Sequence, residues 1–380
     1  MGTSHQDRGP TRTVGAAVLA VVLAGATMAG CGAAESGNDG KLEGKALDQC
    51  MSKAKELRDT KREEPPLKVL GPFDMAANHG KALWVINAAR VPLLQRISDG
   101  AEAAGSKAGM NVKTIFGDGT TSSAQAAVRQ ATAQGADGIA LIAVDPTTIQ
   151  SAIDDAVSAG IVVTDVGNRS EGDPLSPGIS GQMGYNIPKE MDAMAGWIMA
   201  DSKCSANALM YSPTSLPITV AASKALEARY SALCPTCAFE LKDLDYGNFA
   251  KTLTAEVQTD VRRKPDLTYI IAIIGSSVPN VDAGLRNSDV RVLTHDGLDD
   301  TLKALRDGDT KVGADFAFAP NESIGWQVVD QLGRLLQEQP GATEAVIPTR
   351  LVDRSNIGST EADVWPSYAK YQAAYEQAWR

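Results

Sequence analysis

One stretch carries three consecutive elements, and it reads Gln134-Gly135-Ala136-Asp137-Gly138-Ile139-Ala140-Leu141-Ile142-Ala143-Val144-Asp145-Pro146. The almost wholly apolar run from Gly138 to Val144 predicts a strand that is covered on both faces of a parallel sheet. Before this run, alanines and Val128 at helical spacing predict a helix that stops at Gly135. After it, Asp145-Pro146 predict the cap and first turn of another helix.

The same alternation of strand and helix extends in both directions along the chain. Alternation of this kind predicts right-handed βαβ crossovers and a doubly wound parallel sheet. The units are too many for one small sheet, so the predicted fold class is α/β with two doubly wound lobes. The further strands are expected at 84–86, 112–116, 161–163, 208–211, near 239, and at 267–274, 290–294 and 312–316. The further helices are expected at 94–104, 149–156, 188–202, 220–233, 301–306 and 323–336.

The N-terminus predicts an exported lipoprotein. Arg8 and Arg12 precede an apolar run from Val14 to Met28, which has the organisation of a signal peptide. Met28-Ala29-Gly30-Cys31 then resembles the lipobox of bacterial lipoproteins. The resemblance implies cleavage before Cys31, lipid on Cys31 and anchorage to the outer face of the cell membrane. An apolar N-terminal helix with an accidental cysteine is the alternative.

Composition and motifs narrow the class of function. A net charge of -10 without a long basic run argues against a nucleic-acid partner. The sequence holds no G-x-S-x-G elbow and no P-loop, and Gly117-Asp118-Gly119 lacks the third glycine of a dinucleotide fingerprint. We therefore predict a protein that is not an enzyme and that uses no cofactor, although paired carboxylates leave acid–base chemistry open.

Four cysteines follow Cys31, and an exported protein can pair them as disulfides. Cys50, Cys204, Cys234 and Cys237 allow three full pairings, among which the sequence does not choose. The spacing of Cys234 and Cys237 also fits a redox motif or half a zinc site. A structural disulfide is preferred because this pair follows a helix instead of starting one. No metal site is expected, because none of the three histidines has ligand-like spacing to a cysteine.

Several short motifs resemble the type I periplasmic solute-binding proteins, in particular their ribose-binding branch. The motifs are Gln134 to Ile139 with Val144-Asp145-Pro146, Ala159 to Val163, and Leu293-Thr294-His295-Asp296-Gly297. The resemblance runs from about Ala82 to Leu336. It implies two lobes joined by three crossings, which close on a ligand at the C-terminal ends of the strands. It also implies a monomer whose partner is an ABC permease.

On this basis the sequence divides into six parts. They are a signal peptide (1–30), lipidated Cys31 with a flexible tether and a charged helix (31–66), an N-terminal lobe (67–181), a C-terminal lobe (182–319), a return to the N-terminal lobe (320–345) and a C-terminal extension (346–380). Helices are expected at 46–62 in the second part and at 365–379 in the last.

The resemblance also implies ligand-binding residues, position by position. Asp296 matches a family carboxylate that accepts hydrogen bonds from sugar hydroxyls, although it also fits a helix cap before Leu298. Tyr246 falls where the family often has an aromatic ring that stacks on a sugar. The remaining candidates follow strands or stand near family binding positions: Asn87, Arg90, Asp165, Asn168, Ser276 and Phe318.

The candidate pocket departs from the ribose pattern at several positions. Val91-Pro92-Leu93-Leu94 replaces paired aromatics, Gly275-Ser276-Ser277 stands where an Asn-Asp pair is usual, and Phe318 stands near an expected glutamine. We predict the solute-binding subunit of an ABC importer with a monosaccharide as ligand. A polyol or a carboxylated ligand clamped by Arg90 is the alternative ligand. A lipid-anchored sensor or a secreted enzyme on a related α/β fold is the alternative function.

Overall fold

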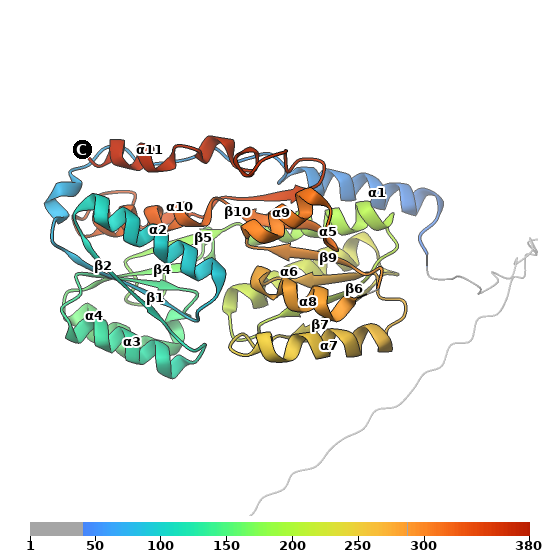
Figure 1. The fold of residues 1–380 in the computed structure, drawn as a ribbon, viewed down its shortest axis with the longest axis horizontal. Coiled ribbons are helices and arrows are strands. Elements are labelled where there is room, and N and C mark those ends of the chain that lie inside the picture. Colours follow the sequence, from blue (N-terminus) through green and yellow to red (C-terminus); the bar gives the residue numbers. More distant parts are fainter. Residues whose placement is uncertain (1–40, 287) are drawn as a thin grey trace, which may run out of the picture. The chain divides into compact units, whose positions relative to one another are not determined.

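Two six-stranded sheets organise the computed structural model, which describes residues 41–286 and 288–380. The two sheets confirm the predicted α/β class with two doubly wound lobes (Figure 1). The predicted signal peptide and Cys31 lie outside the described residues. Within the described part of the chain, no helix is long and apolar enough to cross a membrane.

The first sheet has the strand order β11-β5-β4-β3-β1-β2, and all its strands run parallel. Strand β3, the apolar run predicted above, pairs with β1 on one side and β4 on the other, and every residue in it is buried. The strands are β1 (Ala82–Asn87), β2 (Asn111–Phe116), β3 (Gly138–Ile142), β4 (Val162–Ser170), β5 (Gly181–Tyr185) and β11 (Glu344–Val346). Its helices are α2 (Pro92–Ala108), α3 (Thr121–Ala133), α4 (Gln150–Ser158) and α10 (Asn321–Leu335).

Alternating side chains of the central strands enter two different apolar layers, because successive residues of a strand point to opposite faces. Ile139 and Leu141 pack with residues of α3 and α4, whereas Ala140 and Ile142 belong to the cluster that contains the buried residues of α2. Helices therefore cover both faces of this sheet (Figure 1). This double cover explains why β3 carries no polar side chain.

The second sheet has the order β12-β10-β9-β8-β6-β7, in which only β12 is antiparallel to its neighbour. Two helices of this lobe, Phe249–Arg263 and Val278–Leu285, are not among those expected from the sequence. The strands are β6 (Asn207–Ser212), β7 (Ala238–Asp243), β8 (Tyr269–Ala272), β9 (Arg291–His295), β10 (Val312–Phe318) and β12 (Thr349–Asp353). The helices are α5 (Ile187–Ser202), α6 (Pro217–Leu233), α7 (Phe249–Arg263), α8 (Val278–Leu285) and α9 (Asp299–Asp307).

The chain passes between the two sheets three times. It crosses from β5 to α5 after Tyr185, from β10 to α10 after Phe318, and from β11 to β12 between Val346 and Thr349. The sequence placed the first crossing near residue 181, whereas β5 continues in the first sheet to Tyr185. Residues 346–380, expected as an extension, contain β12 and so also supply an edge strand of the second sheet.

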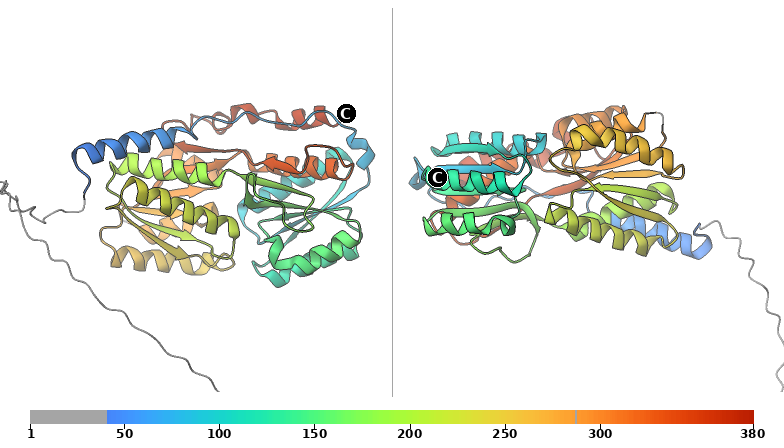
Figure 2. Two further views of the ribbon diagram at one scale, coloured as in Figure 1. Left: turned by 180° about the vertical axis from the view of Figure 1, so that it is seen from behind. Right: turned by 90° about the horizontal axis from the view of Figure 1, so that it is seen from below.

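Helix α1 (Gly44–Asp59) packs against α5 through Cys50, Ala54 and Leu57, which lie on one face of the helix. The backbones approach closely there, because a Cβ atom on Gly196 would lie 2.6 Å from the carbonyl oxygen of Ala54. Beyond α1, residues 61–73 form a segment that we call the strap. The strap runs alongside residues 365–380, which we call the C-terminal segment (Figures 1 and 2), and the Phe73 amide donates to the Ala378 carbonyl at 2.9 Å.

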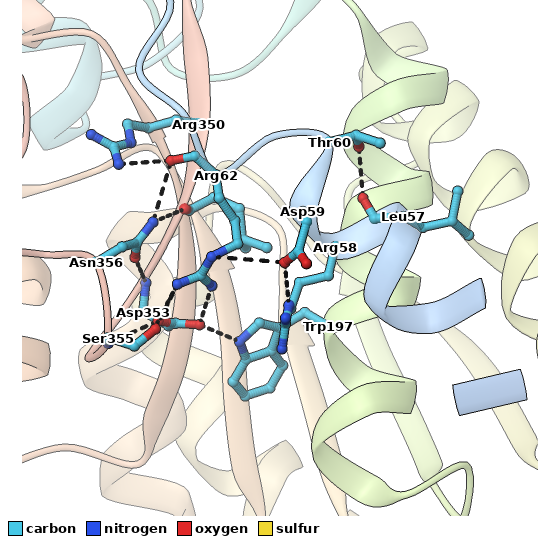
Figure 3. A network of polar contacts seen from close by, with 11 residues as sticks. Leu57, Arg58, Asp59, Thr60, Arg62, Trp197, Arg350, Asp353, Ser355 and Asn356 are labelled. Atoms are coloured by element: carbon cyan, nitrogen blue, oxygen red, sulfur yellow. Dashed lines mark hydrogen bonds and ion pairs between the residues drawn. The ribbon is translucent and has the colours of Figure 1, made fainter. Parts of the chain in front are cut away.

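An ion pair fastens the beginning of the strap to the second lobe (Figure 3). Arg62 donates from Nη1 to Asp353 Oδ2 at 2.6 Å and from Nη2 to Oδ1 at 3.2 Å, and the Trp197 indole donates to the same carboxylate at 3.0 Å. Burial raises the pKa of Asp353, but hydrogen bonds from Arg62 and Ser355 outweigh it and hold this pKa at about 2. Asp353 therefore stays ionised at neutral pH.

The C-terminal segment contacts both lobes. A 3₁₀ turn (Pro366–Tyr368) and the short helix α11 (Tyr371–Ala378) replace the continuous helix expected at 365–379. Trp365 packs in a cluster with Val352 of β12, in the second lobe. Trp379 stacks on Trp326 of α10, in the first lobe, with ring centroids 5.2 Å apart.

Two disulfides are present among the described residues: Cys50–Cys204 and Cys234–Cys237. The first joins α1 to the end of α5, and the second closes the turn after α6. The preference for a structural disulfide at Cys234 and Cys237 agrees with this pairing. The choice among the three full pairings came only from the structure.

We expect the two disulfides to differ in their effect on stability. The cysteines of Cys50–Cys204 are 154 residues apart and those of Cys234–Cys237 only 3, so the first restricts the unfolded chain far more. The chain-entropy relation gives about 5 kcal/mol for the long loop and about 1.5 kcal/mol for the short one. Guanidinium unfolding of the double variants Cys50→Ala/Cys204→Ala and Cys234→Ala/Cys237→Ala measures the difference. Equal losses in the two variants would contradict this expectation.

Candidate functional site

A cavity of about 80 Å³ lies where strands of both sheets reach their C-terminal ends. The first lobe contributes Ile142 from β3 and Tyr185 from β5, and the second contributes His295 from β9 and Phe318 from β10. Ligands of open α/β sheets bind at this edge, where the chain crossings leave a crevice. The cavity is therefore the candidate binding site.

Aliphatic side chains form most of the cavity wall. Only a few lining residues carry polar side-chain atoms: Tyr185, Thr219, Tyr246, His295 and Asp296. The apolar lining consists of Val91, Leu93, Leu94, Ile97, Ile142, Val166, Ile187, Met191, Leu216, Ile218, Ile273, Ile274, Phe318, Ile324 and Ile347, with Ala143, Gly167 and Ala222.

Asp296 sits at the polar side of the cavity in an unusual backbone conformation. Its φ angle is +91°, a region that costs a residue with a side chain about 1–3 kcal/mol. Its Oδ2 accepts a hydrogen bond from the Gly275 amide at 2.7 Å, and its side chain is almost fully buried. A Cβ atom on Gly275 would lie 2.3 Å from the His295 carbonyl oxygen, so only glycine allows this approach.

A buried chain of charged groups leads from the strap to Asp296. Lys61 Nζ lies 3.8 Å from Glu190 Oε1, and Glu190 Oε2 lies 3.3 Å from His295 Nε2. His295 Nδ1 in turn lies 3.3 Å from Asp296 Oδ1. The Thr349 hydroxyl of β12 also donates to Glu190. The network thus alternates positive and negative groups, with no net charge while His295 is protonated.

His295 is fully buried, and opposing effects act on its pKa. Burial lowers the pKa, but hydrogen bonds with the Asp296 and Glu190 carboxylates raise it by more than burial lowers it. The resulting pKa of His295 is about 9. His295 is therefore an imidazolium at neutral pH, and both ring nitrogens donate to carboxylates. A histidine held in this way is a structural cation with no nitrogen left to act as a base.

Two aromatic rings of the cavity lining, Tyr185 and Phe318, lie against His295. Phe318 meets Tyr185 edge to face, with centroids 5.4 Å apart, and meets the His295 ring in the same way at 4.7 Å. Tyr246 is buried in the cavity wall, and burial raises its pKa. Within the described part of the chain, the hydroxyls of Tyr185 and Tyr246 have no hydrogen-bond partner. Both hydroxyls are therefore available to a ligand.

Comparison with known proteins places this arrangement in a recognised fold. Residues 84–176 match the model of a periplasmic binding protein domain. A Burkholderia graminis ABC transporter solute-binding protein, solved with D-arabinose, is 23% identical, with a TM-score of 0.65 over 74% of this chain and 98% of its own. The chain has the type I periplasmic binding protein fold.

Two further binding proteins share the fold. A sugar ABC transporter structure from Yersinia enterocolitica has a TM-score of 0.69 and 16% identity over 82% of this chain and 99% of its own. The 5-methylthioribose transporter solute-binding protein of Thermotoga lettingae has a TM-score of 0.67 and 12% identity over 78% and 98%. A comparison with curated proteins gave no match.

Three of the eight ligand residues expected from the sequence line the cavity of this binding-protein fold: Asp296, Tyr246 and Phe318. Two others lie outside its lining, near the end of β1. Asn87 is buried and donates to Ser98 and to the carbonyl of Ile115. Arg90 is exposed, with its guanidinium 4.0 Å from the centre of the Phe116 ring.

The remaining three expected residues are also absent from the cavity lining. Asn168 Nδ2 donates to Asp165 Oδ1 at 2.5 Å and to the Val144 carbonyl at 3.0 Å. Burial raises the pKa of Asp165 to about 7, an effect that Asn168 only partly offsets. The buried Ser276 hydroxyl has no partner among the described residues.

Sequence reasoning missed Tyr185 and His295 as site residues. The sequence offers His295 only as part of the motif that contains Asp296 and as a histidine without zinc-ligand spacing. Tyr185 ends β5, a few residues beyond the crossing expected near residue 181. A position at the C-terminal end of a strand is the signal that could have found both residues, because parallel strands end at one edge of a sheet.

We expect His295 to make stability fall between pH 7 and pH 9. A pKa raised from 6.5 to about 9 in the folded protein stabilises it fully below pH 6.5, and this contribution is lost as pH rises through 9. The loss between pH 7 and pH 9 is about 2 kcal/mol. Denaturant unfolding of wild type and His295→Gln at both pH values measures it.

The effect of His295 is isolated by comparing how steeply the free energy of unfolding falls between pH 7 and pH 9 in wild type and in the variants. This dependence is called the slope below. His295→Gln is less stable at pH 7, because it leaves Glu190 and Asp296 without their shared cation, but its stability changes less between pH 7 and pH 9. His79 is unrelated to the network, and His79→Gln serves as the control that keeps the wild-type slope. An unchanged slope in His295→Gln would contradict the assignment.

Proposed function

We propose that the chain is the solute-binding subunit of an ABC importer, exported and anchored by lipid on Cys31 to the outer face of the cell membrane. The observation that carries the proposal is a cavity at the C-terminal ends of two parallel sheets, beside three chain crossings. Such crossings allow the lobes to part and close, and the closed form presents one surface to a permease. The three similar structures reported above are each described as part of a transporter.

A monosaccharide is the ligand class expected from the sequence, and two observations support a ligand of this kind. Asp296 offers carboxylate oxygens, and Tyr185 and Tyr246 offer hydroxyls, among the residues that line the cavity. The Burkholderia protein is described with D-arabinose and the Thermotoga protein with 5-methylthioribose. A carboxylated ligand is less well supported, because Arg90 rests on Phe116 outside the cavity lining.

Binding without chemical conversion fits the titratable groups of the cavity. His295 and Asp296 are the ionisable acid–base pair in its wall, and each is bonded to the other. The imidazolium also bonds Glu190, so a proton transfer from it would leave a buried carboxylate unpaired. A sensor would use the same cavity and differ only in the protein that receives the closed form.

We expect Asp296→Asn to weaken ligand binding at least tenfold. The substitution replaces a charged acceptor by a neutral amide of the same shape, and charge-assisted hydrogen bonds are about twice as strong as neutral ones. Isothermal titration calorimetry with the ligand found in a thermal-shift screen of sugars, polyols and small carboxylates measures the loss. Arg90→Gln is the matched control and keeps wild-type affinity for a neutral ligand. A stronger loss in Arg90→Gln than in Asp296→Asn would favour the carboxylated ligand.

We expect Cys31→Ser to release the protein from the membrane. A serine hydroxyl cannot take the place of the thiol that the lipid-transfer reaction requires, so the variant carries no lipid. Fractionation of cells that express wild type or Cys31→Ser, with mass spectrometry of the N-terminal peptide, tests this expectation. Recovery of both proteins in the membrane fraction with equal masses would argue against lipid anchorage.

A further inference from the structure

We propose that the ligand of this cavity is a neutral molecule with an aliphatic body and few hydroxyl groups, gathered at one end. A deoxygenated or alkyl-substituted sugar or a related cyclic diol belongs to this class, and a fully hydroxylated sugar or polyol does not. The proposal rests on the function proposed above and names the ligand chemistry of the same site.

The walls supply the first reason. Branched aliphatic side chains from both lobes face the cavity, including Leu94 and Ile142 from the first lobe and Ile218 and Ile274 from the second. None of these side chains can donate or accept a hydrogen bond. A ligand surface in contact with them gains free energy when it is apolar and loses hydrogen bonds to water when it is hydroxylated.

The polar groups are few and lie together. The Tyr185 ring centroid lies 5.8 Å from that of His295, and His295 Nδ1 lies 3.3 Å from Asp296 Oδ1. Tyr246 lines the same cavity, and burial and the charge of Asp296 raise its pKa. The Thr219 hydroxyl is occupied by the backbone carbonyls of its own turn. Tyr185, Tyr246 and Asp296 therefore form one polar end of the cavity.

The charge balance of this end favours a neutral ligand. Asp296 is the carboxylate that lines the cavity, and it already faces the His295 imidazolium. His295 is shared with Glu190, and Glu190 with Lys61, so each charge in the chain has a neighbour of opposite sign. A charged ligand group would be buried here without a counter-charge of its own, which is costly.

The aliphatic walls set the cost of each additional ligand hydroxyl. A hydroxyl that faces Leu94, Ile142 or Ile218 finds no donor or acceptor in those side chains. Each ligand hydroxyl that faces the walls therefore stays unpaired, at a loss of about tenfold or more in affinity.

Two probes with the same carbon ring test the proposal. In cis-1,2-cyclohexanediol the two hydroxyls are adjacent, whereas myo-inositol carries a hydroxyl on every ring carbon. We expect the full-length protein, purified in detergent, to bind the diol at least tenfold more tightly than myo-inositol in isothermal titration calorimetry. Native mass spectrometry of the same sample identifies any ligand that co-purifies.

A pair of variants at one wall position provides the matched control. Ile218 lies in the first turn of α6 and lines the cavity. Ile218→Val and Ile218→Thr introduce side chains of the same shape that differ only by a methyl group against a hydroxyl. We expect the Thr variant to shift the preference towards myo-inositol several-fold relative to the Val variant, and thermal unfolding verifies that both are folded.

The outcomes separate the two proposals. Equal or tighter binding of myo-inositol would overturn the ligand class and leave the solute-binding function intact, as would co-purification of a fully hydroxylated sugar. Identical preferences in the Val and Thr variants would show that the Ile218 wall does not contact ligand and would also overturn it. Absence of binding by both probes and by every compound of the sugar and carboxylate screen, with nothing co-purified, would overturn the proposed function itself.

Discussion

The imidazolium of His295, held between two carboxylates, constrains the elements that meet at the cavity. Glu190 stands in the first turn of α5, immediately after one chain crossing, and Thr349 begins β12 after another. Asp296 follows β9 at the cavity wall. Since removing one partner of a buried ion pair costs about 3–5 kcal/mol, these elements are held in one arrangement. The position of Asp296 against a ligand is therefore coupled to the crossings that would move when the lobes part.

The terminal segments add to this coupling. Lys61 extends the charged chain into the strap, and the adjacent Arg62 is bound to Asp353 in β12. Further along the strap, the Phe73 ring lies 4.1 Å from the guanidinium of Arg334 in α10, which belongs to the first lobe. The strap and the C-terminal segment thus each contact both lobes. A rotation of the lobes changes the geometry of these two segments in addition to the three crossings.

The chemistry of the cavity separates this protein from the sugar-binding pattern that its sequence resembles. Aliphatic residues such as Leu93 and Leu94 stand in place of the paired aromatics, and Phe318 stands near the expected glutamine. A carboxylate at Asp296 and an aromatic ring at Tyr246 remain. The fold tolerates this exchange because the strands and helices depend on periodicity and burial, which Leu and Ile satisfy as well as aromatic residues do. The same exchange weakens hydrogen bonding to a ligand. A ligand hydroxyl that is buried without a partner loses its hydrogen bonds to water, and nothing else in the complex replaces them.

The sequence by itself determined the two-lobed α/β class, because the buried run of β3 and the alternation around it are local patterns with a physical period. It also contains a signal for α7, namely Phe249, Leu253 and Val257 at four-residue spacing. Only the tertiary structure decided which cysteines pair and which residues meet at the cavity. The wall residues come from strand ends and helix starts of both lobes, and in the sequence each one, such as Ile142 or Ile218, is indistinguishable from a core residue. Whether such a residue lies in the core or in the cavity wall depends on how the two sheets are placed relative to one another. Local sequence periodicity does not encode this placement.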